Sequence, residues 1–174
     1  LTLAATRPDA VRRLVLAAPA GLASYPRPAV RVLAGGVNRL LAARRSLAPL
    51  TDLGWGRRLL LLTAVADAAA LPPTQARLLV EASASSRRSS EALATIATAD
   101  LRPVLERAPA PLGLIWGEQD RTVPASLSRS VTEVRPDAQV ELIADAGHVS
   151  MVEQPEAFVA ALERMLETLR RTSG

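Results

Sequence analysis

The fold is decided by the apolar run Leu112-Gly-Leu-Ile-Trp116, which lies between Pro111 and Gly117. A short run without polar alternation, bounded by Pro and Gly, is typical of a strand buried on both faces of a parallel sheet. A second apolar run, Val140-Glu-Leu-Ile143, follows further along the chain. We expect a second strand there, with one face less buried on account of Glu141.

The residues between these two runs predict a helix. Pro124 suits the first turn of a helix, and apolar residues recur after it at i, i+4 and i+7. These apolar residues are Leu127, Val131 and Val134. Strand, helix and strand together occupy residues 112–143, which is the size of a right-handed βαβ unit.

Two further elements flank this unit. Residues 13–18, Arg13-Leu-Val-Leu-Ala-Ala18, predict another strand of the same sheet, buried on both faces. A final helix is expected to begin at Pro155, with Glu156 in its first turn, and to end near Arg170 and Arg171, so that its charges complement the helix dipole. Its predicted apolar stripe consists of Phe158, Leu162, Met165, Leu166 and Leu169.

Residues 22–108 differ in character from both ends of the chain. They are rich in Ala, Leu and Arg, and they contain Pro72-Pro73 and the polar run Ser83–Ser90. A connection of this length between two strands of one sheet is too long for an ordinary crossover. We therefore expect an α/β fold with three parallel strands and flanking helices. It would comprise a helix end and strand at 1–21, an inserted helical segment at 22–108 that forms a lid, a cap or a small domain of its own, and a carboxyl-terminal part at 109–174.

The composition is that of a globular protein, with 49% apolar and 22% charged residues and no Cys. All 21 basic residues are Arg, which leave a net charge of +4 over 17 carboxylates. The arginines are scattered as pairs rather than gathered in one run. Two Trp, one Tyr and one Phe offer almost no platform for stacking bases. We therefore expect no nucleic-acid partner.

Membrane and metal sites are not predicted either. The longest apolar stretch, Leu59–Leu71, contains Thr63 and Asp67 and is too short to cross a bilayer, so we expect no transmembrane helix. One His and no Cys leave too few ligands for a metal site, and no organic cofactor is implied. The sequence leaves the oligomeric state and the compartment open, with the cytoplasm as the default.

Two polar loops follow the two predicted strands of the βαβ unit. Asp120 comes shortly after Trp116, and His148, the only histidine, comes shortly after Ile143. Adjacent parallel strands end side by side, so these loops should meet. An Asp that accepts from one imidazole nitrogen leaves the other nitrogen free to exchange a proton with a reacting group. The spacing alone equally suits an Asp that caps the following helix and a His that bonds a backbone carbonyl.

The sequence resembles a family at three motifs. These are Gly117-x-x-Asp120-x-x-Val123-Pro124, then Gly147-His148, then Glu153-x-Pro155-Glu156-x-Phe158, and in this order they resemble the carboxyl half of an α/β-hydrolase. Residues 6–21 are similar to the helix end and strand that follow the nucleophile elbow of that family. The resemblance covers 1–21 and about 100–171, and the insertion corresponds in position to the family's helical cap. It implies that Asp120 is the acid and His148 the base of a catalytic triad.

The nucleophile motif of the family, G-x-S-x-G, does not occur in the sequence. Residues 1–6 look like the tail of the helix that begins at the nucleophile elbow. We therefore expect the nucleophile, whether Ser, Asp or Cys, a short way upstream of Leu1, together with the oxyanion-hole amides. By this interpretation the 174 residues are part of a hydrolase and are inactive alone.

Other residues compete for the same roles. Asp145 lies on the histidine loop and Glu118 lies nearer the strand end, but the motif places the acid at Asp120. No serine follows a buried strand on a tight Gly turn, so we expect solvent or capping roles for them. The serines in question are Ser24, Ser126, Ser150 and those within Ser83–Ser90.

The resemblance implies hydrolysis of an ester or related acyl bond in a hydrophobic small molecule, since an Ala- and Leu-rich cap would line the pocket with aliphatic surface. Epoxide hydrolases, dehalogenases and carbon-carbon bond hydrolases belong to the same family, so these activities stay open. Val149 stands after His148 in place of the Trp frequent in the carbon-carbon bond hydrolases, which argues against that subclass. A non-catalytic remnant or binding module of the same fold would share every motif named here.

Overall fold

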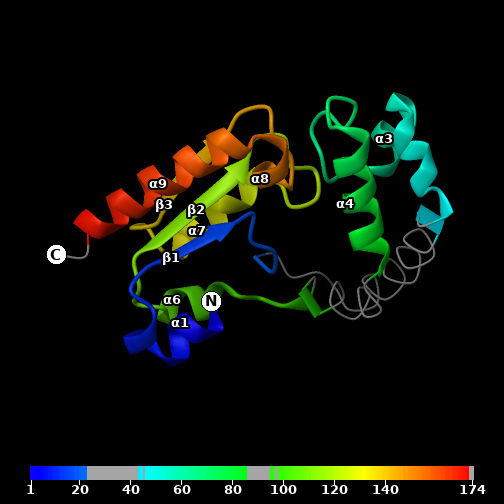
Figure 1. The fold of residues 1–174 in the computed structure, drawn as a ribbon. Helices are drawn as coiled ribbons and strands as arrows, with labels where there is room; N and C mark the ends of the chain where they lie inside the picture. Colours follow the sequence, from blue (N-terminus) through cyan, green and yellow to red (C-terminus); the bar gives the residue numbers. More distant parts are fainter. Residues whose placement is uncertain (23–42, 45, 86–94, 97, 173–174) are drawn as a thin grey trace.

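The computed structural model describes residues 1–22, 43–44, 46–85, 95–96 and 98–172. Its centre is a three-stranded parallel sheet with the order β1-β2-β3 (Figure 1). The strands are β1 (Leu14–Ala17), β2 (Leu112–Gly117) and β3 (Gln139–Ile143). Leu14 pairs with Leu112 across the first strand pair, and Gly113 pairs with Gln139 across the second. The predicted α/β class with three parallel strands is therefore confirmed.

Helices α6 (Arg102–Arg107) and α7 (Ser128–Val134) cover one face of the sheet. Their Leu105 and Val131 are fully buried against alternate residues of β2, namely Leu112, Leu114 and Trp116. The helix predicted over 124–134 begins as a 3₁₀ turn, η3 (Ala125–Leu127), and continues as α7. Two short elements, α1 (Thr2–Thr6) and η1 (Pro8–Ala10), precede β1, and α1 lies beside α6.

Helix α9 (Pro155–Arg171) covers the opposite face and runs along the sheet in Figure 1. Ile115 of β2 packs there with Met165. The helix approaches so closely that a Cβ added to Gly113 would lie 2.5 Å from the sulfur of Met165. The predicted bounds of this helix are confirmed, although Leu166 of the predicted stripe is 39% exposed.

The two outer strands are more exposed than the sequence predicts. β1 is half-buried with an exposed Ala17, not buried on both faces, because it pairs only with β2 among the described residues. In β3, Val140 and Leu142 are 39% and 48% exposed, whereas Glu141 is half-buried. Glu141 pairs with Arg164 on the face that α9 covers. The less buried face is therefore the apolar one, which corrects the expectation for Glu141.

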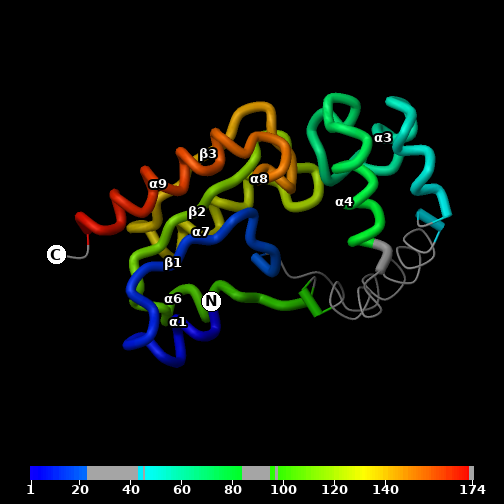
Figure 2. Tube along the Cα trace, viewed as in Figure 1, coloured from blue at the N-terminus to red at the C-terminus, as the bar shows by residue number. Residues whose placement is uncertain are grey.

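The helices of the insertion have a core of their own and lie apart from the sheet (Figures 1 and 2). They are η2 (Ala48–Asp52), α3 (Gly54–Leu60) and α4 (Pro73–Ser85). Leu60, Val65 and Val80 are buried together among them. Residues 23–42, 45, 86–94 and 97 of the predicted insertion lie outside the described residues. Helix α6, which the predicted boundary at 108 assigns to the insertion, packs with the sheet instead.

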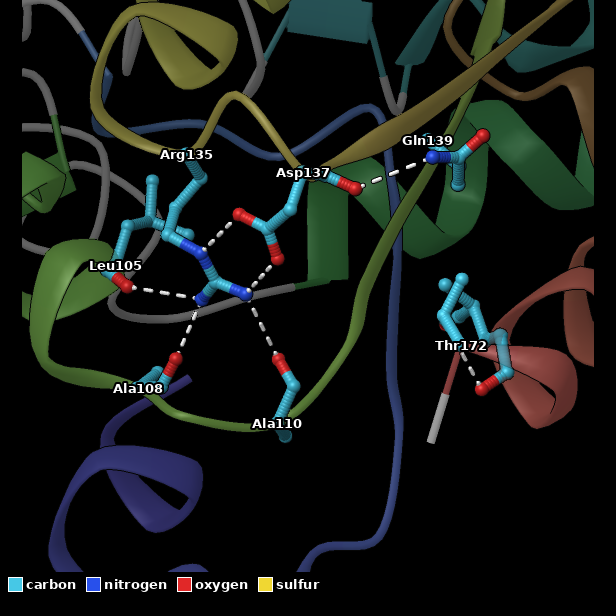
Figure 3. A network of polar contacts seen from close by, with 8 residues as sticks. Leu105, Ala108, Ala110, Arg135, Asp137, Gln139 and Thr172 are labelled. Carbon is cyan, nitrogen blue, oxygen red and sulfur yellow. Dashed lines mark hydrogen bonds and ion pairs between the residues drawn. The ribbon is translucent and has the colours of Figure 1, made fainter. Parts of the chain in front are cut away.

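At the end of the sheet where β2 and β3 begin, Arg135 binds three backbone carbonyls of the segment that ends α6 and leads into β2 (Figure 3). Its guanidinium donates to the carbonyl oxygens of Leu105, Ala108 and Ala110, at 3.3 Å for Leu105 and 3.1 Å for Ala110. It also pairs with Asp137 at 2.7 Å, and this hydrogen bond lowers the pKa of the Asp137 carboxyl. The chain just beyond the end of a helix needs donors for its carbonyls, and the guanidinium supplies them to Ala108 and Ala110, while the carbonyl of Leu105 also accepts the N–H of Ala108.

Candidate active site

The loops that follow β2 and β3 meet backbone to backbone at the carboxyl end of the sheet. Gly117 pairs with Ile143, and the N–H of Gln119 donates to the carbonyl of Ala146 at 2.9 Å. A Cβ added to Gly117 would lie 2.2 Å from the carbonyl oxygen of Gly147. Only glycine permits this approach, which brings the two predicted site loops together.

Asp120 and His148, one from each loop, form a hydrogen-bonded pair. Nδ1 of His148 lies 2.8 Å from Oδ2 of Asp120. The Asp120 side chain is completely buried, whereas the imidazole is 30% exposed. When Nδ1 donates this bond, Nε2 of the neutral imidazole carries no proton and can accept one. The residues predicted to lie side by side therefore do so, in the geometry of a proton-transfer pair.

Backbone amides and a buried indole hold the acid in place. Oδ1 of Asp120 accepts the N–H groups of Thr122 and Val123, both at 2.8 Å. Trp116, expected in the core and fully buried there, donates its Nε1–H to the carbonyl of Val123 at 2.7 Å. The alternative in which Asp120 only satisfies nearby backbone amides accounts for Oδ1 but not for Oδ2, which serves His148.

The residues that compete with Asp120 and with a serine nucleophile have other surroundings. Asp145 is exposed and accepts a hydrogen bond from Gln119 at 3.2 Å, and Glu118 is exposed as well. Ser150 is buried at the start of α8 (Ser150–Glu153), and Ser126 is exposed on η3. The hydroxyl of Ser83 bonds to a carbonyl within α4. Ser24 and residues 86–90 lie outside the described residues.

The insertion reaches this site through residues 62–66. The Thr122 hydroxyl donates to the carbonyl of Thr63 at 2.9 Å. The backbone N–H of His148 donates to the carbonyl of Ala64, also at 2.9 Å. One segment of the insertion therefore contacts both the acid loop and the histidine loop.

Glu153, at the end of α8, was not assigned a role from the sequence beyond its place in a motif. Its Oε1 accepts the N–H of Gly147 at 2.8 Å, and its Oε2 accepts the N–H of Ala66 at 2.7 Å. Burial raises the pKa of this carboxyl and the charge of Asp120 adds to the increase, while the backbone N–H donors oppose it. The available signal was a carboxylate five residues after the only histidine.

The described residues contain neither a helix suited to span a membrane nor a group of side chains suited to hold a metal ion. No described helix combines the length and the apolar character needed to cross a bilayer. No group of three His, Cys, Asp or Glu side chains lies close enough there to hold a metal ion.

Comparisons with known proteins agree on one family. The model of the alpha/beta hydrolase family matches residues 2–161. LipZ of Mycobacterium tuberculosis, which carries a provisional hydrolase name, is 34% identical over 58 residues, or 33% of this chain. Those residues are 20% of the LipZ sequence, so the chain matches only a small part of that relative.

Solved structures extend the likeness over nearly the whole chain. A hydrolase from Pseudomonas aeruginosa is 25% identical with a TM-score of 0.64, covering 94% of this chain and 58% of that protein. An esterase from Thermogutta terrifontis is 18% identical with a TM-score of 0.64, covering 95% of this chain and 59% of that protein. A bacterial membrane phospholipase A is 22% identical with a TM-score of 0.65, covering 96% and 52%. The chain thus spans somewhat more than half the length of these proteins.

The match of the family model over residues 2–161 and the parallel sheet with its flanking helices lead to one conclusion. The chain belongs to the alpha/beta hydrolase family.

Proposed function

We propose that this chain supplies the acid and the base of a hydrolase whose nucleophile lies in polypeptide beyond these 174 residues. His148 takes a proton from the nucleophile and returns it to the leaving group, and Asp120 orients and stabilises the imidazolium. One observation carries this assignment: the 2.8 Å hydrogen bond between Nδ1 of the only histidine and a completely buried carboxylate.

Two observations support the proposal that the nucleophile lies outside these 174 residues. No G-x-S-x-G occurs in the 174 residues. The similar hydrolase and esterase structures are matched over only 58% and 59% of their length. We propose that the 174 residues alone do not turn over substrate.

The proposed substrate is an ester or related acyl compound with a hydrophobic group. Three large apolar residues of the insertion, Trp55, Leu59 and Leu62, are 58%, 58% and 56% exposed. The i, i+4 spacing places Trp55 and Leu59 on one side of α3, and Leu62 lies in the turn just beyond the end of that helix. Leu62 precedes Thr63, whose carbonyl is bonded by the acid loop. The exposed apolar side chains Trp55, Leu59 and Leu62 therefore extend from a segment next to the proposed site, and they suit an aliphatic substrate.

The assignment is tested on the completed hydrolase, which we define as these 174 residues joined to the natural sequence upstream of Leu1, where we expect the nucleophile. It would be assayed with p-nitrophenyl esters of increasing acyl length. We expect His148→Ala to lower kcat by several orders of magnitude. Ser126→Ala is the matched control, because this serine is exposed on η3, and it should leave kcat unchanged.

Full activity of the His148→Ala variant would overturn the mechanism. A completed protein that folds cooperatively but hydrolyses none of these esters, and contains no nucleophile on a glycine turn, would instead support the non-catalytic binding module.

A further inference from the structure

The Glu153 carboxylate joins two parts of the chain that are far apart in sequence. One oxygen accepts the N–H of Gly147, next to the histidine, and the other accepts the N–H of Ala66 in the insertion. The side chain is half-buried and makes no ion pair among the described residues. Both oxygens therefore serve backbone amides that no other carboxylate reaches in this part of the chain.

The backbone that carries the imidazole is held between these contacts. The N–H groups of His148 and Val149 donate to the carbonyl of Ala64, at 2.9 Å and 3.3 Å. A Cβ added to Gly147 would lie 2.8 Å from the nitrogen of Ala66 and 3.0 Å from the carbonyl oxygen of Ala64. A displacement of the insertion would therefore displace the histidine loop with it.

We propose that Glu153 is a positioning residue, which locks the helical insertion onto the histidine loop and thereby holds His148 against Asp120. It acts through the backbone of Gly147 and Ala66, not through the substrate. Its importance for turnover rests on the proposed function of the pair, whereas the lock itself can be observed without any turnover.

The chemistry of the carboxylate explains why Glu suits this place. An ionised carboxylate offers an acceptor oxygen to each N–H group, and such charge-assisted hydrogen bonds are stronger than neutral ones. An amide of the same shape offers only one acceptor oxygen, and its NH₂ would face a backbone donor. Glu153→Gln should therefore break one of the two bonds while it preserves the packing.

The experiment measures the single histidine of the 174-residue chain. Because His148 is the only histidine, its imidazole NMR signals need no assignment. In Glu153→Gln we expect these signals to shift and one of the two amides, that of Gly147 or that of Ala66, to exchange with solvent roughly tenfold faster, the effect of losing one hydrogen bond. Glu156→Gln is the matched control, because this exposed carboxylate lies at the start of α9. It should change neither the signals nor the exchange rates.

A second variant breaks the lock from the side of the insertion. Ala66→Pro removes the N–H donor to Glu153 and places a ring carbon where that hydrogen pointed, so the carboxylate can no longer bind residue 66 of the insertion. We expect it to shift the His148 imidazole signals in the same direction as Glu153→Gln. The proposal is overturned if both variants leave the imidazole signals where they are in the wild-type chain. It is also overturned if Glu153→Gln accelerates exchange only within α8 and α9, since Glu153 would then support those helices alone.

These readouts are independent of activity. If the completed hydrolase proved inactive, the imidazole shifts and exchange rates would still decide whether Glu153 locks the insertion to the histidine loop.

Discussion

Side chains of opposite charge bind the backbone at the two ends of this parallel sheet. At the amino end, the Arg135 guanidinium donates to three carbonyls around the end of α6. At the carboxyl end, Asp120 and Glu153 accept four backbone N–H groups between them. A cation suits the amino end because carbonyls at and just beyond the end of α6 accept its hydrogen bonds, and carboxylates suit the other end because backbone amides of its loops donate to them.

The two ends differ in whether their charged side chains also bind a partly exposed side chain. All the hydrogen bonds named for Arg135 go to backbone carbonyls or to the neighbouring Asp137, and the cluster is structural. Asp120 keeps one oxygen for His148, whose ring is partly exposed. We infer that polar groups at the amino end determine stability, whereas those at the carboxyl end determine chemistry.

The largest effect is expected at the acid. Asp120→Asn in the completed hydrolase keeps an oxygen for the loop amides but cannot hold the imidazole as a carboxylate does. We expect kcat to fall by about 10⁴-fold, the size typical of a triad acid, with little change in the melting temperature. Steady-state ester hydrolysis and a thermal melt measure both quantities. A loss of less than tenfold would remove Asp120 from the mechanism.

A smaller loss is expected where the two site loops touch. In Gly117→Ala the new Cβ would lie 2.2 Å and 2.4 Å from the carbonyl oxygens of Gly147 and Ala146, which are rigid backbone atoms. The histidine loop must move, and a displacement near 1 Å costs about 100-fold in rate. Gly54→Ala is the control, because its Cβ would meet only a guanidinium nitrogen of Arg57 at 3.8 Å. Equal kcat for both variants would show that the loop contact is irrelevant to the chemistry.

At the amino end of the sheet we expect a substitution to change the stability of the fold and not the activity. Arg135→Met leaves the carbonyls of Ala108 and Ala110 without the guanidinium donor, whereas that of Leu105 keeps the N–H of Ala108, and this should lower the free energy of unfolding by about 2–3 kcal/mol. Urea denaturation measures this loss, and kcat of the folded completed hydrolase should not change. Arg7→Met is the control, since Arg7 only pairs with Asp9 on the surface and should cost under about 1 kcal/mol. A fall in kcat with Arg135→Met would erase the contrast between the two ends.

The smallest effect is a pH dependence of opposite sign at the two ends. Folding raises the pKa of Glu153 above 4.5, so the folded chain binds this proton more tightly than the unfolded chain. The unfolding free energy of the wild type minus that of Glu153→Gln should therefore increase as the pH falls from neutrality toward 4.5.

Folding lowers the pKa of Asp137 below 3.8, chiefly through its hydrogen bond with Arg135. The corresponding difference for Asp137→Asn should be constant above pH 3.8 and decrease as the pH falls through the lowered pKa. Urea titrations at several pH values measure both differences. The same sign for both variants would contradict the assignment of these carboxylates.

The sequence predicts a strand correctly where both faces of that strand are buried. The run Leu112–Trp116 has no polar residue because helices cover both faces of β2, so its pattern predicts its place correctly. The outer strands break this rule. Val140 and Leu142 are apolar yet exposed, because α9 covers only the face that carries Glu141 and Ile143. Apolar composition alone does not tell which face of an edge strand is covered.

The proximity of Asp120 and His148 was predictable, since parallel order brings successive loops together. The role of Glu153 was not. Its partners are backbone amides, one of them in the insertion 87 residues away, and main-chain donors leave no trace in side-chain identity. The contact of residues 62–66 with both site loops is hidden from sequence reasoning for the same reason.

The imidazole of His148 offers the most direct test of the central claim, that Asp120 orients the only histidine as a base. Nitrogen-15 NMR of the 174-residue chain with a neutral ring needs no residue assignment, and the couplings to the ring protons distinguish its two nitrogens. We predict a proton on Nδ1, held by Asp120, and a bare Nε2, with this preference lost in Asp120→Asn. A neutral ring that is protonated on Nε2 in the wild-type chain would contradict the account.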